Sequence, residues 1–419
     1  MSNITKFVSE HLHDDINRLI LDRKKWPEID MELAVSCIES RRKLRTKVPQ
    51  WYAEEGLIFP AKLSAEQCSS TATAIYKAKL AELIATEGSE RQWRIADLTG
   101  GMGIDSWYFA QRASEVLYNE MQQCLCDAAR HNFMILNTSN IIISNREICA
   151  GTSFPKLFDT FMPDIIYMDP ARRSESGRKV FLMEQCSPDV LTLKEDIFSI
   201  SRHFLLKLSP MADISMVCER LGPQCREVHI VASDGECKEL LIWMDREWND
   251  EPYIIACELK SQEGEPSVCT LVFKPSEEKE ASAKNTALTG APEEKWLFEP
   301  GKSLMKAGAF GTIRERFRIS KIGKSTHYYT FCEDEKVAEL MKYGKVFRIV
   351  GNFPLDKQTI RHIGKSHPRA EVTARNLPMD SDALRKKLGV TASDDTHIFG
   401  LRSDIYGNRL YITEPLRQA

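Results

Sequence analysis

The sequence lacks several features that would assign a function class at once. No apolar run approaches the roughly 20 residues that a membrane-spanning helix needs, and the amino terminus shows no charged segment followed by an apolar one. We therefore expect a cytoplasmic protein with no membrane partner. The 9 histidines and 12 cysteines show no metal-ligand spacing, and most cysteines lie in apolar segments, so we expect reduced cysteines and no bound metal.

A glycine-rich turn at residues 95–105 is the most informative feature that is present. The sequence Ile-Ala-Asp-Leu-Thr-Gly-Gly-Met-Gly-Ile-Asp predicts a short strand, a tight turn and the start of a helix. Counted from Gly100, the third glycine of a dinucleotide fingerprint would fall on Asp105, and no Walker lysine follows. The pattern therefore disfavours a phosphate-binding loop and predicts a ligand held by main-chain groups.

This turn resembles motif I of class I S-adenosylmethionine-dependent methyltransferases, in which an acidic residue ends the strand and the pattern is D-x-x-G-G-x-G. The resemblance implies S-adenosyl-L-methionine as the cofactor. It assigns the following residues of the turn to cofactor binding: Asp97, Thr99, Gly100, Gly101, Gly103 and Asp105. An incidental strand-turn-helix of another α/β fold is the alternative interpretation.

The next strands extend this pattern. A strand predicted at residues 115–118 ends at Glu120, where nucleoside-binding sheets place a carboxylate for the ribose hydroxyls. Glu120 is therefore the expected ribose ligand, with a solvated loop acid as the alternative. A third strand is predicted at 141–143, and the segment 149–153 that follows has no acid where the resembling family contacts adenine. The adenine contact near Thr152 is left unassigned.

Residues 1–92 are expected to form a helical region. Apolar residues at intervals of three and four between Ile4 and Ile20 predict one amphipathic helix, and a further helix is predicted over 63–78 with Ser64 as its N-cap. In the resembling methyltransferases, helices at this position reach the carboxylate of the cofactor, which makes Gln67 and Ser70 candidates for that contact. Helix capping and packing are their alternative role.

A second motif lies at residues 163–173, where an apolar strand runs into Met-Asp-Pro-Ala-Arg-Arg. Reactants meet at the carboxyl ends of the strands in such sheets. Methyltransferases of nucleic-acid amino groups carry D-P-P-aromatic here, and the resemblance assigns catalytic roles to four residues: Asp169, Pro170, Arg172 and Arg173. The carboxylate and backbone would orient the acceptor, and the arginines would hold a base or phosphate. Ordinary surface cations are the alternative for the two arginines.

The remaining elements of this domain predict how the sheet ends. A strand at 204–208 is followed by Ser209-Pro210, whereas RNA pyrimidine C5-methyltransferases need a nucleophilic cysteine there, so we reject that mechanism. A helix at 214–221, a strand at 227–233, a turn at Asp234-Gly235 and a strand at 239–244 predict an antiparallel pair at the end of a parallel sheet. The expected fold class is α/β, with a Rossmann-like seven-stranded methyltransferase sheet.

The carboxy-terminal part differs from the rest in charge and pattern. Residues 274–294 predict a linker without regular structure, because they are polar and show no apolar period. From Gly301 to Tyr411 the chain carries roughly 21 Lys and Arg against 12 Asp and Glu. Strands are predicted at 345–350, 370–375, 396–401 and 409–412, and helices at 356–364 and 380–388, with Gly389 as a cap.

This order, with Ala-Arg-Asn-Leu-Pro at 374–378 and Leu-Arg-Lys-Lys-Leu at 384–388, resembles the THUMP-like carboxy-terminal domain of a bacterial methyltransferase family. The segment 298–331 is similar to the small ferredoxin-like domain of that family. We therefore expect four regions: a helical region over 1–92, a methyltransferase domain over 93–275, a linker and ferredoxin-like domain over 276–340, and a THUMP-like α+β domain over 341–419.

Related THUMP modules deliver structured RNA to a catalytic domain, so the resemblance implies RNA, either tRNA or rRNA, as a partner of the basic carboxy-terminal region. The leading hypothesis is a methyltransferase that uses S-adenosyl-L-methionine to modify a nucleotide of such an RNA. Two alternatives stay open: a non-catalytic RNA-binding protein with a degenerate methyltransferase domain, and a methyltransferase for protein or small molecules.

Overall fold

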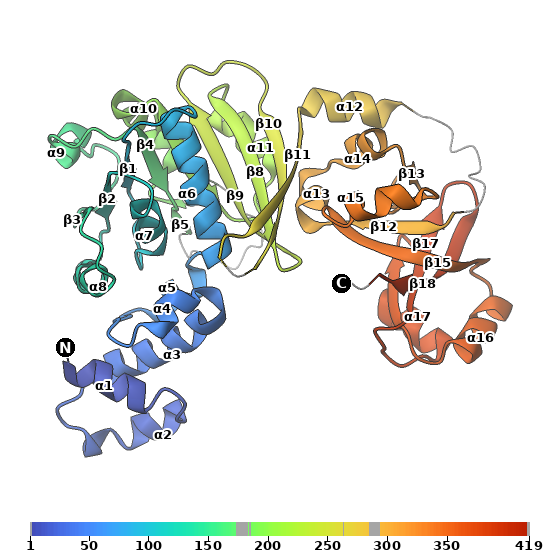
Figure 1. Cartoon of the computed structure of the whole chain (residues 1–419), viewed down its shortest axis with the longest axis horizontal. Helices are drawn as coiled ribbons and strands as arrows, with labels where there is room; N and C mark the ends of the chain where they lie inside the picture. The colour runs from blue at the N-terminus through green and yellow to red at the C-terminus, as the bar shows by residue number, and fades with distance from the viewer. Residues whose placement is uncertain (1, 173–182, 184–185, 263, 285–293, 417–419) are drawn as a thin grey trace. The chain divides into compact units, whose positions relative to one another are not determined.

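The structure is a computed structural model that describes residues 2–172, 183, 186–262, 264–284 and 294–416 (Figure 1). It is a mixed α/β protein with a nine-stranded and a seven-stranded sheet. The chain forms two compact units. The first consists of Met1–Ser233, Lys238–Pro252 and Leu259–Ser267, and the second of Asp234–Cys237, Tyr253–Glu258 and Val268–Ala419.

The amino-terminal region is helical, as expected: α1 (Ser2–Glu10), α2 (Ile16–Leu21), α3 (Met31–Lys47), α4 (Pro49–Ala53), α5 (Lys62–Gln67) and α6 (Thr71–Thr86). Two expected helices are wrong in their bounds. The amphipathic helix through Ile20 is broken, because Asp15 accepts a hydrogen bond from the Arg18 N–H and so starts α2. Ser64 lies inside α5, and Ser70 instead caps α6 in a reciprocal pair with Thr73.

The large sheet has the strand order β11-β10-β8-β9-β7-β4-β1-β2-β3. Its strands are β1 (Arg94–Asp97), β2 (Glu115–Asn119), β3 (Ile141–Ser144), β4 (Ile165–Met168), β7 (His203–Leu208), β8 (Cys225–Ser233), β9 (Glu236–Asp245), β10 (Tyr253–Lys260) and β11 (Ser267–Phe273). Strands β3, β2, β1, β4 and β7 pair in parallel, and β9 is antiparallel to β7. The expected seven strands are therefore confirmed, and β10 and β11 extend the sheet beyond β8.

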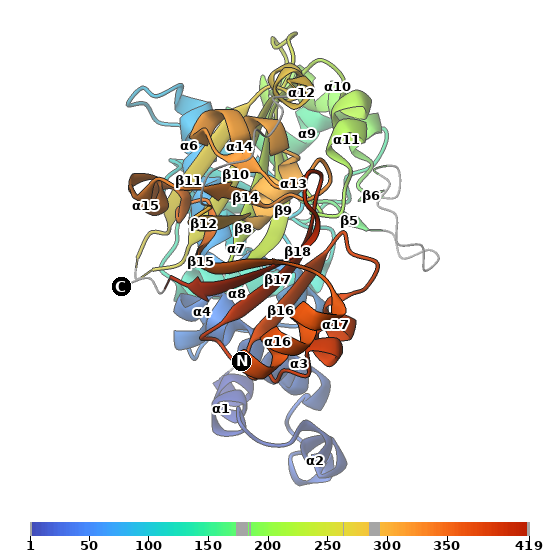
Figure 2. The ribbon, with the colours of Figure 1, turned by 90° about the vertical axis from the view of Figure 1, so that its right-hand side faces the viewer.

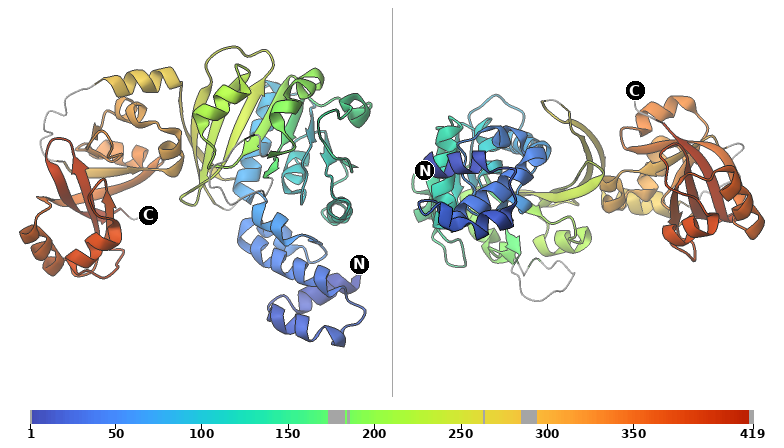
Figure 3. Two further views of the ribbon diagram at one scale, coloured as in Figure 1. Left: turned by 180° about the vertical axis from the view of Figure 1, so that it is seen from behind. Right: turned by 90° about the horizontal axis from the view of Figure 1, so that it is seen from below.

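Helices cover both faces of this sheet. They are α7 (Ile104–Ala110), α8 (Gln123–Ile135), α9 (Phe154–Phe158), α10 (Val190–Ile200) and α11 (Ile214–Leu221). Helices α6 and α7 lie on one face and α10 and α11 on the opposite one, as Figures 1 and 3 show from opposite sides. The predicted turn between β8 and β9 is a two-residue hairpin in which Asp234 and Gly235 have φ values of 54° and 76°, the combination that matches the twist of paired strands.

The second unit contains a sheet of order β13-β14-β12-β15-β18-β17-β16. Its elements are α12 (Pro275–Ala283), β12 (Trp296–Pro300), α13 (Lys302–Ala307), α14 (Phe310–Phe317), β13 (Ser320–Lys321), β14 (Tyr329–Phe331), α15 (Val337–Leu340), β15 (Gly344–Pro354), α16 (Lys357–Ser366), β16 (Glu371–Arg375), α17 (Ser381–Leu388), β17 (His397–Ser403) and β18 (Gly407–Pro415). Because β12 pairs with β15, the ferredoxin-like and THUMP-like parts share one sheet.

The carboxy-terminal strands and helices confirm the predicted order. Helices α16 and α17 lie together against the strands β16, β17 and β18 (Figure 2), and a core that includes Ile363, Leu384 and Ile398 fills the space between them. Asp380 caps α17 by accepting a hydrogen bond from the Ala383 N–H, and Gly389 ends the helix in the left-handed conformation.

The expected linker at 274–294 is wrong in its first part, which forms α12. The Glu278 carboxylate of this helix accepts hydrogen bonds of 2.8 Å from the Gly311 N–H, the Thr312 N–H and the Thr312 hydroxyl at the start of α14. Composition cannot show such a tertiary partner, which supplies an acceptor to the unpaired N–H groups of a helix. Residues 285–293 of the expected linker lie outside the described residues.

Candidate active site

The glycine-rich turn lies between β1 and α7 and is shaped by close contacts with β2. The Gly100 N–H donates to the Asn119 carbonyl at 2.8 Å, and a Cβ on Gly100 would lie 2.2 Å from Cε2 of the buried Tyr118 ring. Glycine is therefore required there by the close approach of an aromatic ring. Gly101 differs, because a Cβ on it would meet only the Thr99 carbonyl, at 3.9 Å. The turn is thus open above Gly101.

Asp97 ends β1 beneath this turn and is buried. Its carboxylate accepts a hydrogen bond of 2.6 Å from the Ser106 hydroxyl and one of 3.1 Å from the Thr99 N–H. Burial raises the pKa of Asp97 to about 7, which outweighs the effect of these hydrogen bonds. Asp97 therefore orders the turn from below.

Glu120, the expected ribose ligand, follows β2 and faces the same turn. One carboxylate oxygen accepts a hydrogen bond of 3.0 Å from the Gly101 N–H, and the other accepts one of 2.9 Å from the Gln122 N–H. The neighbouring Asn119 amide donates to the Leu98 and Arg146 carbonyls, whereas its buried Oδ1 has no hydrogen-bond partner within the described parts of the chain. A buried acceptor without a partner is uncommon in folded proteins.

The second motif lies directly beside the first. Strands β1 and β4 are neighbours, and the Asp169 N–H donates to the Thr99 hydroxyl over 2.6 Å. Asp169 follows β4 and is partly exposed, and Pro170 is buried. The backbone of Arg172 belongs to the short strand β5 (Ala171–Arg172), which pairs with β6 (Cys186–Ser187). Arg173 lies outside the described residues, so the structure says nothing about its predicted role.

A row of five alternating acids and lysines connects the two motifs, in the order Asp105, Lys77, Glu239, Lys207 and Asp169. The nitrogen-to-oxygen distances along it are 3.1, 3.2, 3.9 and 2.5 Å. We call these five residues the charge row. Its middle members are almost fully buried, with 0% exposure for the Lys77 side chain and 4% for that of Glu239, whereas Asp169 is 36% exposed.

Asp105 is the largely buried terminal member of the charge row, next to Lys77. Its Oδ2 accepts hydrogen bonds of 2.9 Å from both the Ser69 and the Tyr167 hydroxyls. Burial acts to raise the pKa of Asp105, but Lys77 and further partners outweigh it, so the pKa is lowered and the group is ionised. This candidate cofactor ligand therefore makes its contacts with neighbouring side chains of the protein.

Lys207 lies between Glu239 and Asp169. Burial acts to lower its pKa, yet the nearby carboxylates of Asp169, Glu239 and Asp105 outweigh burial and raise it, so the ammonium keeps its proton. The sequence patterns did not single out Lys207, Lys77 or Glu239 as site residues. The signal for Lys207 was its place in an otherwise apolar strand, Phe-Leu-Leu-Lys-Leu, where a lysine must find a carboxylate partner.

The two candidates upstream of the turn occupy different environments. Gln67 is exposed at the end of α5, and Ser70 is engaged in the cap of α6. Ser69, which lies between them, donates to Asp105 instead. The structure therefore brings Ser69 to the motif I helix and leaves Gln67 on the surface. No cluster of three or more potential metal ligands occurs among the described residues, and none of their helices is long and apolar enough to cross a bilayer.

Comparisons with known proteins agree with this geometry. A family model of a ferredoxin-like domain matches residues 296–336, and one of a THUMP-like domain matches residues 344–415. The crystal structure of a "putative methyltransferase" from Porphyromonas gingivalis W83 is 26% identical, with a TM-score of 0.82 over 99% of this chain and 98% of that one. This chain has a methyltransferase fold with ferredoxin-like and THUMP-like regions. The resemblance and the fold class inferred from sequence are thereby confirmed.

Other solved structures match only part of the chain. A SAM-dependent methyltransferase from Agrobacterium tumefaciens is 15% identical over 47% of this chain and 59% of its own, with a TM-score of 0.29. A modification subunit of a "putative type I restriction enzyme" from Vibrio vulnificus YJ016 is 11% identical over 46% of this chain and 47% of its own, with a TM-score of 0.32. No curated protein matches the sequence.

Proposed function

We propose that the protein is a methyltransferase that uses S-adenosyl-L-methionine to modify a nucleotide of structured RNA, either tRNA or rRNA. The observation that carries the proposal is the hydrogen bond between the Thr99 hydroxyl and the Asp169 N–H. It joins the turn expected to hold the methyl donor to the loop expected to hold the acceptor. A transfer reaction needs both reactants side by side at one edge of the sheet.

The residues around the turn fit the proposed cofactor. The space above Gly101 and the Glu120 carboxylate beside it offer room and an acceptor suited to the ribose hydroxyls of a nucleoside. Asp97, Thr99, Gly100 and Gly103 shape the turn, and Gln67 and Ser70 remain candidates for the amino-acid end. When bound, S-adenosyl-L-methionine supplies a methyl group already activated by a sulfonium.

The chain itself therefore has to align the acceptor. Asp169 Oδ2 is held by Lys207, whereas Oδ1 has no hydrogen-bond partner within the described residues, so it can accept a hydrogen bond from the acceptor. For a nitrogen acceptor, such a bond turns the lone pair toward the methyl group. Pro170 stiffens the loop, and Arg172 and Arg173 are proposed to hold the base or a phosphate.

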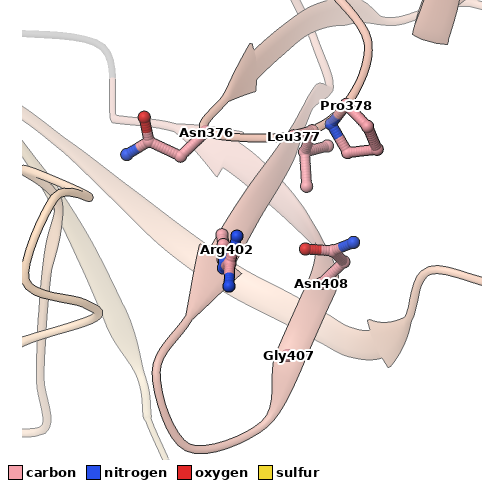
Figure 4. A pocket seen from close by; sticks show the side chains of 6 residues that line it. All are labelled: Asn376, Leu377, Pro378, Arg402, Gly407 and Asn408. Carbon is pink, nitrogen blue, oxygen red and sulfur yellow. The ribbon is translucent and has the colours of Figure 1, made fainter.

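The carboxy-terminal unit offers a place for RNA. A hollow of about 550 Å³ lies in its THUMP-like part, with Leu377 and Pro378 opposite Arg402 and Asn408 (Figure 4). The Arg402 side chain is exposed and forms no ion pair with any described residue, so its guanidinium is available for a phosphate or a base. Together with the excess of basic residues after Gly301, this hollow supports a nucleic-acid partner.

Titration calorimetry with S-adenosyl-L-methionine tests the cofactor. We expect the wild type to bind, and Glu120→Gln to lose at least tenfold in affinity. Glu115→Gln is a matched control, because Glu115 begins the strand β2 that Glu120 follows and pairs with Arg94 instead of the turn. Equal affinities in wild type and Glu120→Gln would argue against the assigned ribose contact. A wild type that does not bind at all would favour the non-catalytic alternative.

Transfer of labelled methyl groups to total RNA from a strain lacking this protein tests the acceptor. We expect Asp169→Asn to lose about 10²-fold in rate with unchanged cofactor affinity, within the usual range for a positioned catalytic group. Asp164→Asn is the control. Asp164 precedes β4 and pairs with Arg91, whereas Asp169 follows β4. Transfer to protein but not to RNA would refute the RNA substrate. Full activity of Asp169→Asn would refute its catalytic role.

A further inference from the structure

The charge row places a lysine where the proposed mechanism needs a fixed carboxylate. Lys207 Nζ lies 2.5 Å from Asp169 Oδ2 and 3.9 Å from Glu239 Oε2, and its side chain is 11% exposed. Among the described residues, the other hydrogen bond of Asp169 is the one that its backbone N–H donates to the Thr99 hydroxyl. The orientation of the Asp169 carboxylate therefore depends on Lys207.

The row also has an uneven charge. Three carboxylates face two ammonium groups, and four of the five side chains are 12% exposed or less. Buried charges are stable only when they are paired. The inner groups satisfy this condition, because Lys77 lies between Asp105 and Glu239, and Lys207 lies between Glu239 and Asp169. The surplus negative charge is then most stable at Asp169, the one member with substantial access to water.

We infer that Lys207 is a positioning residue for methyl transfer, which turns Asp169 Oδ1 toward the acceptor, while Glu239 and Lys77 hold Lys207 in place. This inference rests on the proposed function, because it concerns the same site. Lys207 would act through Asp169 and need not touch the acceptor. A hydrocarbon side chain at position 207 would leave Asp169 tied only by its backbone, and the carboxylate would rotate away from the acceptor.

Strands β7 and β9, which carry Lys207 and Glu239, provide a matched control at their other end. Arg202, immediately before β7, forms a two-point ion pair with Asp245 at the end of β9, at 2.8 and 3.0 Å. Asp245 keeps a second cation, Arg226, just as Glu239 keeps Lys77. Lys207→Met and Arg202→Met therefore each remove one cation from a buried acid on β9, but only the first frees Asp169.

The test compares four variants of the full chain: Lys207→Met, Lys207→Arg, the double variant Lys207→Met with Glu239→Gln, and Arg202→Met. Cofactor affinity is measured by calorimetry, and kcat and KM are measured for methyl transfer to RNA from the deletion strain. We expect Lys207→Met to lose at least tenfold in kcat with cofactor affinity within twofold of wild type. Lys207→Arg should regain part of that loss, and Arg202→Met should keep kcat within threefold.

The double variant separates positioning from stability. In Lys207→Met, the buried Glu239 carboxylate keeps only Lys77 of its two cations. Glu239→Gln removes that carboxylate, so we expect the double variant to regain the melting temperature that Lys207→Met loses. It should not regain kcat, because Asp169 still lacks its anchor. A double variant or a Lys207→Met protein with wild-type kcat would overturn the inference, as would an equal loss in Arg202→Met.

A measurement that needs no activity distinguishes this inference from the proposed function. In a double-mutant cycle of melting temperature, the effects of Lys207→Met and Asp169→Asn should be non-additive, since they remove two sides of one contact. Non-additive shifts in a protein that transfers no methyl group would support the contact between Lys207 and Asp169 and would refute the proposed function. Additive shifts, together with an active wild type, would support the proposed function and would refute the anchoring of Asp169 by Lys207.

Discussion

Replacing Asp97 with asparagine should stabilise the protein at neutral and alkaline pH. Asp97 is buried, and burial raises its pKa from 3.8 to about 7. Asparagine has nearly the same shape and carries no charge. Its Oδ1 can still accept the hydrogen bond from the Thr99 N–H, and its amide can donate to the Ser106 hydroxyl, which rotates to accept.

The magnitude follows from the shift in the Asp97 pKa. A difference of about 3 units between the folded and unfolded protein corresponds to about 4 kcal/mol, because each unit is worth 1.36 kcal/mol. The folded pKa is the higher one, so the unfolded chain releases this proton first as the pH rises. Asp97 therefore does not lower the free energy of unfolding below about pH 4. It lowers this free energy increasingly between pH 4 and 7, and by the full amount above pH 7.

Chemical denaturation of wild type and Asp97→Asn between pH 4 and 8, without added ligand, measures this effect. The two proteins differ only at residue 97, so the pH dependence of the difference in unfolding free energy reports on Asp97 and on its weaker coupling to Asp105 and Asp169. It should be near zero at pH 4 and should rise to between 2 and about 4 kcal/mol in favour of the variant at pH 8. A difference that is flat with pH, or a variant less stable at pH 8, would refute the reasoning that burial dominates at Asp97.

Three further predictions test the packing of the turn and the second unit. Gly100→Ala should lose about 1–3 kcal/mol of stability and weaken cofactor binding, because its Cβ would overlap the Tyr118 ring; denaturation and calorimetry measure the two losses, and wild-type values would argue against the close packing. Glu278→Ala should cost about 1–3 kcal/mol, since it removes three hydrogen bonds to Gly311 and Thr312, and faster amide exchange at the start of α14 should accompany the loss. Asp380→Ala should cost about 1 kcal/mol as a lost helix cap of α17, with cofactor affinity unchanged.

The parts of the fold that sequence predicted are those determined by local patterns. The glycine-rich turn, the Asp234-Gly235 hairpin and the Gly389 helix end each follow from residues adjacent in the chain. The long amphipathic helix failed because Asp15 provides a cap within an apolar period. In each case a short-range interaction decides the outcome, and propensity over a longer window does not.

The parts that sequence did not predict depend on partners far apart in the chain. Helix α12 was missed although Pro275 and Glu277 mark its first turn. Its further support is remote, because Glu278 finds its hydrogen-bond donors 33 and 34 residues later, in α14. For the site, the two motifs and Glu120 were found as expected positions at strand ends, whereas Lys77 and Glu239, which are separated by 162 residues, meet only once the sheet has formed. The roles of the individual site residues remain predictions.

The direction of one strand explains why the charge row lies at the proposed active edge. Strand β9 runs antiparallel to β7, so Leu240 near its start pairs with Leu208, and Asp245 at its end pairs with His203. Glu239 therefore lies at the carboxyl end of the parallel strands, beside Lys207 and Asp169. A parallel β9 would place Glu239 at the opposite edge of the sheet, away from Lys207 and Asp169. The antiparallel strand next to β7 thus supplies Glu239, one of the groups proposed to hold Lys207 in place.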